Sequence, residues 1–242
     1  MSSNFDLVDK QLSLVIVGAF HALNFTNDWL KYHELMHEDD FRASETKVHN
    51  GFHMETSLPW STIQVMPHDR DRNRLTITLT DPAMFSQFVD LTTSICTMFS
   101  TTLVTALGIN FLFLTKHKDQ DSWDEFGHRL LPPPTFSRVF NPDETKCRVG
   151  MNNCSIKFVR LLESVIELDD DELFTELNVT VKPVYYDANG ERIYFSTETN
   201  LNYHFPMPNN LGMDAVYQTL QVYLAQLNES VDEQVMKFVR GD

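Results

Sequence analysis

Residues 74–89, RLTITLTDPAMFSQFV, carry two hydrophobic periods in direct succession. From Leu75 to Leu79 apolar side chains alternate with threonines, which is the pattern of a strand with one apolar face. Asp81 then suits a helix N-cap, and Pro82 suits the first turn of a helix. The aromatic residues that follow recur at three and four, as on one face of an α-helix. The stretch therefore predicts a strand followed at once by a helix, which is typical of α+β proteins.

The strand at 74–80 has a predicted partner immediately before it. Residues 60–66, WSTIQVM, also alternate, and the polar stretch 67–73 indicates a turn, so the two segments predict a β-hairpin. Two further apolar stretches, 12–20 and 103–114, predict buried strands. Within the second, Gly108 indicates a bulge or the close approach of another backbone.

The rest of the chain is again rich in strand patterns. Residues 155–160 and 164–168 predict one or two strands, and residues 177–186 and 191–205 predict a hairpin around the Asn-Gly turn at 187–190. The acidic run 169–172 indicates a solvated turn, since it lacks the ligand spacing of a calcium loop. From Met213 to Phe238 apolar residues recur at three and four, which predicts a long amphipathic helix.

These segments predict an α+β fold of two related halves, each an antiparallel sheet covered by a long amphipathic helix. The N-terminal half would span residues 1–118 and the C-terminal half residues 147–242. The connection at 119–146 contains a short predicted helix near 123–130. It also contains three consecutive prolines at 132–134, which favour an extended spacer.

The composition excludes several classes of protein. The chain has 242 residues, of which 42% are hydrophobic, enough for a folded core. Its 19 Lys and Arg against 34 Asp and Glu give a net charge of -15, a surface that repels nucleic acid and anionic membranes. The sequence has neither an apolar run of membrane-spanning length nor the pattern of a secretory signal. The odd number of cysteines, Cys96, Cys147 and Cys154, indicates a reducing compartment, so we expect a cytoplasmic protein.

One motif suggests catalysis. His33-Glu34-Leu35-Met36-His37 matches the H-E-x-x-H pattern of zinc peptidases, in which two imidazoles one helical turn apart hold the metal. The glutamate between them would be the general base. The motif falls in a predicted helix over residues 29–37, behind an N-cap cluster at 26–28.

The surroundings of this motif favour a chance match. Further ligands are not evident: Glu45 and Glu55 lie in loop-like sequence, and His49 and His53 are the only nearby imidazoles. Active-site helices need apolar packing and supporting hydrogen bonds around the ligands, whereas charged residues surround this motif. We therefore interpret it as a solvated helix that packs through Trp29, Tyr32 and Met36, and we expect no metal, no cofactor and no catalytic residues.

Five stretches carry a family resemblance: the N-terminal strand at 12–20, RLTITLTDP leading into a helix, VTALGINFLFL, TNLNYHF and the helix MDAVYQTLQVYLAQLNESVDEQVMKFV. In their order along most of the chain, they resemble an uncharacterised bacterial family of conserved hypothetical proteins of similar length. The resemblance implies two related α+β halves. It implies no activity, so no functional residues carry over.

The expected function is a non-enzymatic interaction protein from a phage or a bacterial defence context. It would bind a protein partner, basic or itself nucleic-acid-binding, through its acidic surface, without contacting nucleic acid or membrane. One alternative is a zinc hydrolase that uses His33, His37 and Glu34. The other is a homo-oligomeric structural subunit, in which sheet edges or the helix from Met213 pair between chains.

Overall fold

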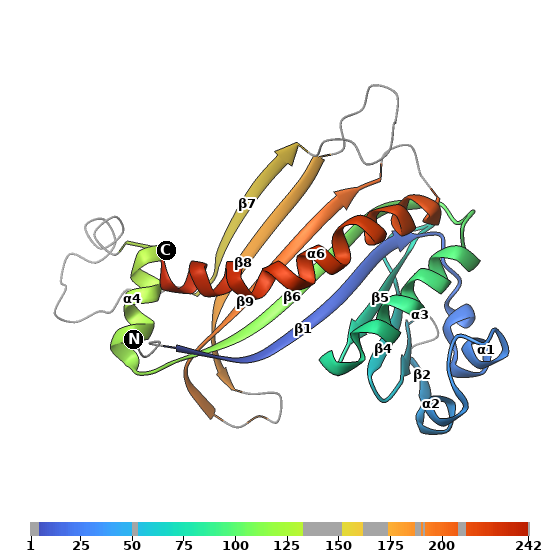
Figure 1. Cartoon of the computed structure of the whole chain (residues 1–242), viewed down its shortest axis with the longest axis horizontal. Helices are drawn as coiled ribbons and strands as arrows, with labels where there is room; N and C mark the ends of the chain where they lie inside the picture. The colour runs from blue at the N-terminus through green and yellow to red at the C-terminus, as the bar shows by residue number, and fades with distance from the viewer. Residues whose placement is uncertain are drawn as a thin grey trace.

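A single antiparallel sheet dominates the structure, which is a computed structural model (Figure 1). It describes residues 5–49, 53–132, 152–161, 174–186, 190, 192–207 and 212–241. Within these residues nine strands pair in the order β2-β3-β4-β5-β1-β6-β9-β8-β7. The strands are β1 (Phe5–Gly18), β2 (Glu45–His49), β3 (His53–Ser57), β4 (Ser61–Pro67), β5 (Asn73–Leu79), β6 (Val104–His117), β7 (Cys154–Leu161), β8 (Phe174–Tyr186) and β9 (Arg192–Pro206).

The prediction of two halves, each with its own sheet under a long helix, is wrong. Strand β6 pairs with β1 on one side and with β9 on the other, so the strands before and after the predicted connection belong to one sheet. The physical reason is that β6 and the second half of β1 are apolar, and each strand is stabilised by hydrogen-bonded neighbours on both sides. The predicted boundaries at 118 and 147 stay a prediction.

Most of the individual strands were predicted correctly. Strands β4 and β5 form the expected hairpin, with Ile63 opposite Ile77. Strand β1 begins at Phe5, before the predicted 12–20, and the apolar pattern missed its first half because that half is polar. Strands β7, β8 and β9 match the segments expected in the C-terminal part. Residues 164–168, the acidic run 169–172 and Asp187–Asn189 of the predicted turn lie outside the described residues. Gly190 beside that turn has φ 80°, a conformation that favours glycine.

Helices pack on one face of this sheet. The longest, α6 (Met213–Arg240), crosses the sheet and contacts β6 and α3 (Phe85–Met98), as Figure 1 shows. Asp81 caps the short η2 (Pro82–Met84) before α3 through the backbone N–H of Ala83, as its sequence predicted. At the two ends of the same face lie α4 (Gln120–Leu130) and the segment η1 (Ala22–Phe25), α1 (Asn27–Tyr32) and α2 (Glu38–Ala43). None of the described helices is long and apolar enough to cross a lipid bilayer.

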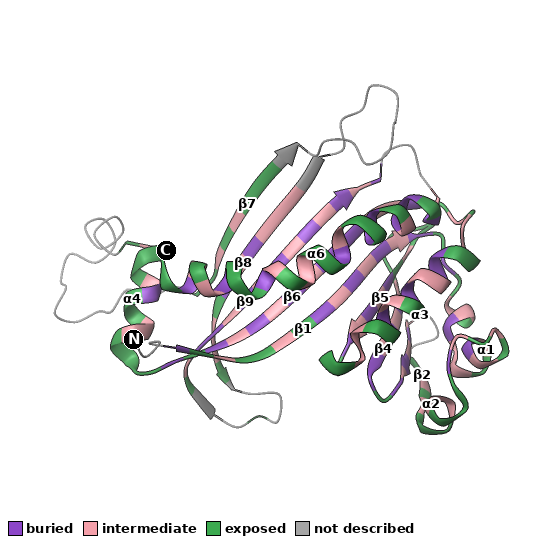
Figure 2. Ribbon diagram, viewed as in Figure 1, coloured by how far each residue is buried: buried purple, intermediate pink, exposed green. Residues whose placement is uncertain are grey.

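The core lies between the sheet and these helices. Figure 2 shows buried and less buried residues alternating along the central strands, as expected where only one face of the sheet is covered. Buried side chains of α3 and α6 meet this face of the sheet; they include Phe88, Leu91, Ile95, Val216, Leu220 and Leu224. Each buried side chain of this size contributes about 1.5–3 kcal/mol through removal of apolar surface from water.

Candidate functional site

Helix α1 ends inside the H-E-x-x-H motif. The N–H of Leu35 donates to the carbonyl of Leu30 at 2.9 Å, and the N–H of Glu34 donates to that of Lys31 at 3.1 Å. These two bonds form a Schellman motif, which closes a helix and satisfies its last carbonyls. Glu34 has φ 57°, so it takes the left-handed position where glycine is usual. The prediction of one helix over residues 29–37 is therefore wrong.

The two imidazoles of the motif lie on different elements. His33 is the C-cap of α1, and its ring packs on Trp29 with centroids 4.1 Å apart. His37 is the N-cap of α2, where its backbone carbonyl accepts from the N–H of Phe41. A zinc-peptidase motif presents both imidazoles from consecutive turns of one helix, and residues 33–37 do not form that arrangement. Among the described residues no group of three or more His, Cys, Asp or Glu side chains is placed to hold a metal ion.

The segment after α2 is a hairpin and not a loop. Glu45 lies on β2 and Glu55 on β3, so the prediction of loop-like structure at both positions is wrong. Strand β2 is short, and most of its side chains are exposed, so it has no apolar alternation that could mark it. The hairpin brings together His49 and His53, whose ring centroids are 4.9 Å apart.

The α1–α2 segment attaches to the core as predicted at two of three positions. Met36 is buried, and Trp29 stacks on Phe99 of the α3 end, with ring centroids 5.6 Å apart. Thr26 caps α1 by accepting from the N–H of Trp29. Tyr32, by contrast, is 82% exposed and does not pack into the core.

The segment that carries this exposed tyrosine is rich in acids. We define the α1–α2 acidic surface by Asp28, Glu34, Glu38, Asp39, Asp40 and Glu45. Among its nearby cations, Lys31 and Arg42 pair with Glu38 at 2.6 and 3.3 Å, and Lys47 pairs with Glu45 at 3.0 Å. Three cations thus stand against six acids, with two of the acids in ion pairs, and the surface keeps a negative balance.

The paired groups show the expected electrostatic effects. The pKa of Glu38 lies below its usual value, chiefly because Lys31 donates a hydrogen bond to its carboxylate and attracts it electrostatically. The pKa of Lys47 lies above its usual value because its ammonium donates to Glu45. These pairs are exposed, so they keep both groups charged near neutral pH and add little to stability.

Two comparisons with known proteins identify no relative. No protein-family model matches the chain, and no curated protein matches it. The functional assignment therefore depends on the residues and geometry described above.

Proposed function

We propose that this chain is a non-enzymatic, cytoplasmic interaction protein that binds a basic protein partner through the α1–α2 acidic surface. The observation that carries the proposal is that Tyr32, 82% exposed, lies in a segment whose acids outnumber its cations. Tyrosine is enriched among the residues that dominate binding energy at protein interfaces. A negative rim around it favours encounter with a positively charged partner.

Comparison of two charge-reversal variants would test this proposal. Asp39 and Asp121 are both exposed and lie in the first turns of α2 and α4, so replacement of either by Lys changes the net charge and the helix end equally. Affinity capture from cell extract should recover a basic protein with the wild type and with Asp121→Lys. Asp39→Lys and Tyr32→Ala should each lose it.

The salt dependence gives a second readout. Binding through charges weakens as salt screens them, so capture of the same partner should fall steeply as the ionic strength rises. Equal capture by wild type, Asp39→Lys and Tyr32→Ala would contradict the proposal, and so would capture that resists salt.

A specific observation favours one alternative, the homo-oligomeric subunit. Among the described strands β7 is an edge strand, and its Phe158 and Val159 are 52% and 62% exposed. An exposed apolar edge offers unpaired backbone groups to a strand of another chain. If β7 pairs between copies, light scattering should show a dimer that Val159→Lys converts to a monomer.

A further inference from the structure

The sheet face opposite the described helices contains a depression with a volume of about 380 Å³. This volume is at the lower end of the roughly 300–1,000 Å³ that small-ligand sites occupy. The residues that line it come from four strands: Gln11, Ser13, Val15 and Val17 of β1, Arg74 of β5, Ala106, Gly108, Asn110 and Leu112 of β6, and Asn200, Asn202 and His204 of β9.

The lining combines apolar residues with amides; we call Val15 and Gly108 the floor of the depression, and the amides of Asn110, Asn200 and Asn202 its wall. Gly108 pairs with Val15 on one side and with His204 on the other, in a regular part of the register. The predicted bulge at this glycine is therefore absent. A side chain added here would have the Asn110 and Asn202 amides as neighbours at 3.5 Å, so the missing side chain leaves room beneath them.

Two amides of this wall have an oxygen without a partner among the described residues. Asn110 pairs directly with Asn202 across β6 and β9, and Asn200 lies two residues along β9. The side-chain carbonyl oxygens of Asn200 and Asn202 are buried and have no hydrogen-bond partner. Leaving a buried acceptor without a partner is unfavourable, and a ligand that donates a hydrogen bond to it would relieve that cost.

The charge of the depression differs from that of the whole protein. Its described lining contains no carboxylate, although the chain carries a net charge of -15. Three acids elsewhere on this face are engaged: Glu176 pairs with Lys157 and Glu198 with Lys182, both at 2.6 Å, and Glu55 accepts from Gln64. Asp9 of β1 accepts from the backbone N–H of Lys10 and has no ion pair among the described residues. Within the described part of the chain, the hydrogen-bond partner of the Arg74 guanidinium is the Met66 sulfur, a weak acceptor, at 3.4 Å. An anion at Arg74 would therefore meet a favourable local charge.

We propose that this depression binds a nucleoside monophosphate. The planar base would lie on the floor of Val15 and Gly108, with its polar edge on the amides. Asparagine and glutamine amides pair with base edges through two hydrogen bonds, so they match this chemistry. The phosphate would bind Arg74, whose strand lies two strand spacings, about 10 Å, from β6. This inference is independent of the interaction proposed for the α1–α2 acidic surface.

Calorimetric titration with AMP, GMP, CMP and UMP, each beside its nucleoside, would test the site. At least one monophosphate should bind saturably. Asn202→Ala should weaken it about tenfold or more, as loss of one bidentate contact predicts. Arg74→Gln should weaken binding of the monophosphate to a similar extent and leave the affinity for the nucleoside unchanged. Asn178→Ala is the matched control, because Asn178 pairs with Asn202 on the same face but does not line the depression.

Several results would overturn the proposal. These are the absence of saturable binding by all four monophosphates at about 1 mM, displacement by inorganic phosphate as effective as by nucleotide, and tighter binding of single-stranded oligonucleotides than of any mononucleotide. If Asn202→Ala unfolds the protein, Arg74→Gln at the exposed end of β5 and amide chemical shifts of Gly108 in the wild type still decide the question. Unchanged shifts at Gly108 on nucleotide addition would count against the site.

Discussion

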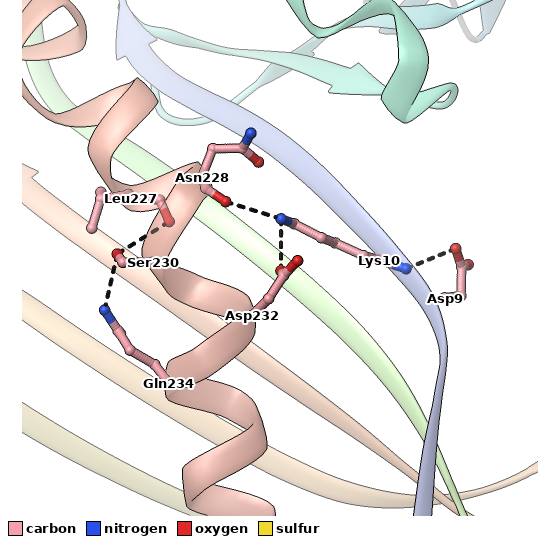
Figure 3. Close-up of polar contacts among 7 residues, drawn as sticks. All are labelled: Asp9, Lys10, Leu227, Asn228, Ser230, Asp232 and Gln234. Carbon is pink, nitrogen blue, oxygen red and sulfur yellow. Dashed lines mark hydrogen bonds and ion pairs between the residues drawn. The ribbon is translucent and has the colours of Figure 1, made fainter.

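The ammonium of Lys10 on β1 lies 2.7 Å from the carboxylate of Asp232 on α6 (Figure 3). The same ammonium donates to the backbone carbonyl of Asn228 at 3.2 Å and lies 5.6 Å from the ring centroid of Phe111. Lys10 therefore connects the long helix to the strand beneath its edge, with the lysine largely buried and Asp232 half exposed.

This arrangement predicts unequal effects of the two partners on stability. Lys10→Ala removes the ion pair, the bond to Asn228 and the stem packing, so urea unfolding should show a loss of about 1–2 kcal/mol. Asp232→Asn should cost less than about 0.5 kcal/mol because its carboxylate is half exposed. Lys237→Ala, which breaks an exposed pair with Glu233 on α6, is the control and should change little. Equal losses for Lys10→Ala and Asp232→Asn would refute this account.

The left-handed backbone at Glu34 predicts a stabilising substitution. Glu34→Gly should raise the free energy of unfolding by about 0.5–1 kcal/mol, because glycine adopts φ 57° without strain. The same exchange inside α4, Glu125→Gly, should lower it by about 0.5–1 kcal/mol through lost helix propensity. Thermal and urea unfolding of both variants would measure the two signs. A lower free energy of unfolding for Glu34→Gly would mean that residues 29–37 form the continuous helix of a zinc-binding motif.

Buried His117 predicts that stability falls in mild acid. Burial, reinforced by the charge of Arg129, lowers the pKa of His117 from 6.5 to about 4. Above pH 6.5 the histidine is neutral in both states. Between pH 6.5 and about 4 only the unfolded chain binds the proton, so stability falls by about 1.4 kcal/mol per pH unit.

The matching experiment compares wild type with His117→Gln, which retains a polar group near Thr197. Nε2 of His117 lies 3.1 Å from the Thr197 hydroxyl. Urea unfolding at pH 6.5 and pH 5 should show that the wild type loses about 2 kcal/mol more than the variant. Identical pH dependence in the two proteins would show that His117 titrates normally.

The two described cysteines should differ in reactivity. Burial raises the pKa of the Cys96 thiol to about 12, and the carboxylate of Asp214 adds to the shift, so the reactive thiolate is scarce at pH 8. Cys154 lies at the start of β7 and is only partly buried. In a Cys147→Ser background, a thiol reagent should modify Cys154 in the native protein and Cys96 only after urea is added. Rapid modification of both thiols without urea would contradict the packing of α3.

Replacement by alanine should have opposite effects on stability at two glycines. A Cβ on Gly212, at the start of α6, would lie 2.5 Å from the backbone carbonyl oxygen of Ser100, so Gly212→Ala should cost about 1–3 kcal/mol. Gly127 lies inside α4 with open space around it, so Gly127→Ala should add about 0.5–1 kcal/mol. The two melting temperatures would test this, and a neutral Gly212→Ala would show that α6 starts further from Ser100.

Sequence patterns predicted the elements whose signals are local. The β4–β5 hairpin follows from alternation. The capped start of η2, which leads into α3, follows from Asp81 and Pro82, which act on their own neighbours. The pairing of β6 with β9 escaped prediction because it joins Leu107 to Phe205, nearly a hundred residues apart. Antiparallel pairing of that range leaves no local pattern in either strand.

The candidate sites escaped prediction for related reasons. A helix stop at Glu34 has no sequence signal, since the left-handed position usually carries glycine. The alternation of Asn200 and Asn202 in TNLNYHF indicated only a strand with a polar face, and Asn110 reaches them only through the sheet register. Gly108 was predicted to mark a bulge or the close approach of another backbone, but its register is regular and its nearest neighbours are side chains of β1, β6 and β9.

The central place of β6 has a consequence for how the molecule could be divided. A cut in the chain between α4 and β7 would separate β1–β6 from β7–β9, and each fragment would be left with a long unsatisfied strand edge, β6 in one and β9 in the other. Neither fragment alone could bury the part of the sheet that it contributes to the surface beneath α6. Co-expressed halves should reassemble with each other, whereas either one alone should aggregate.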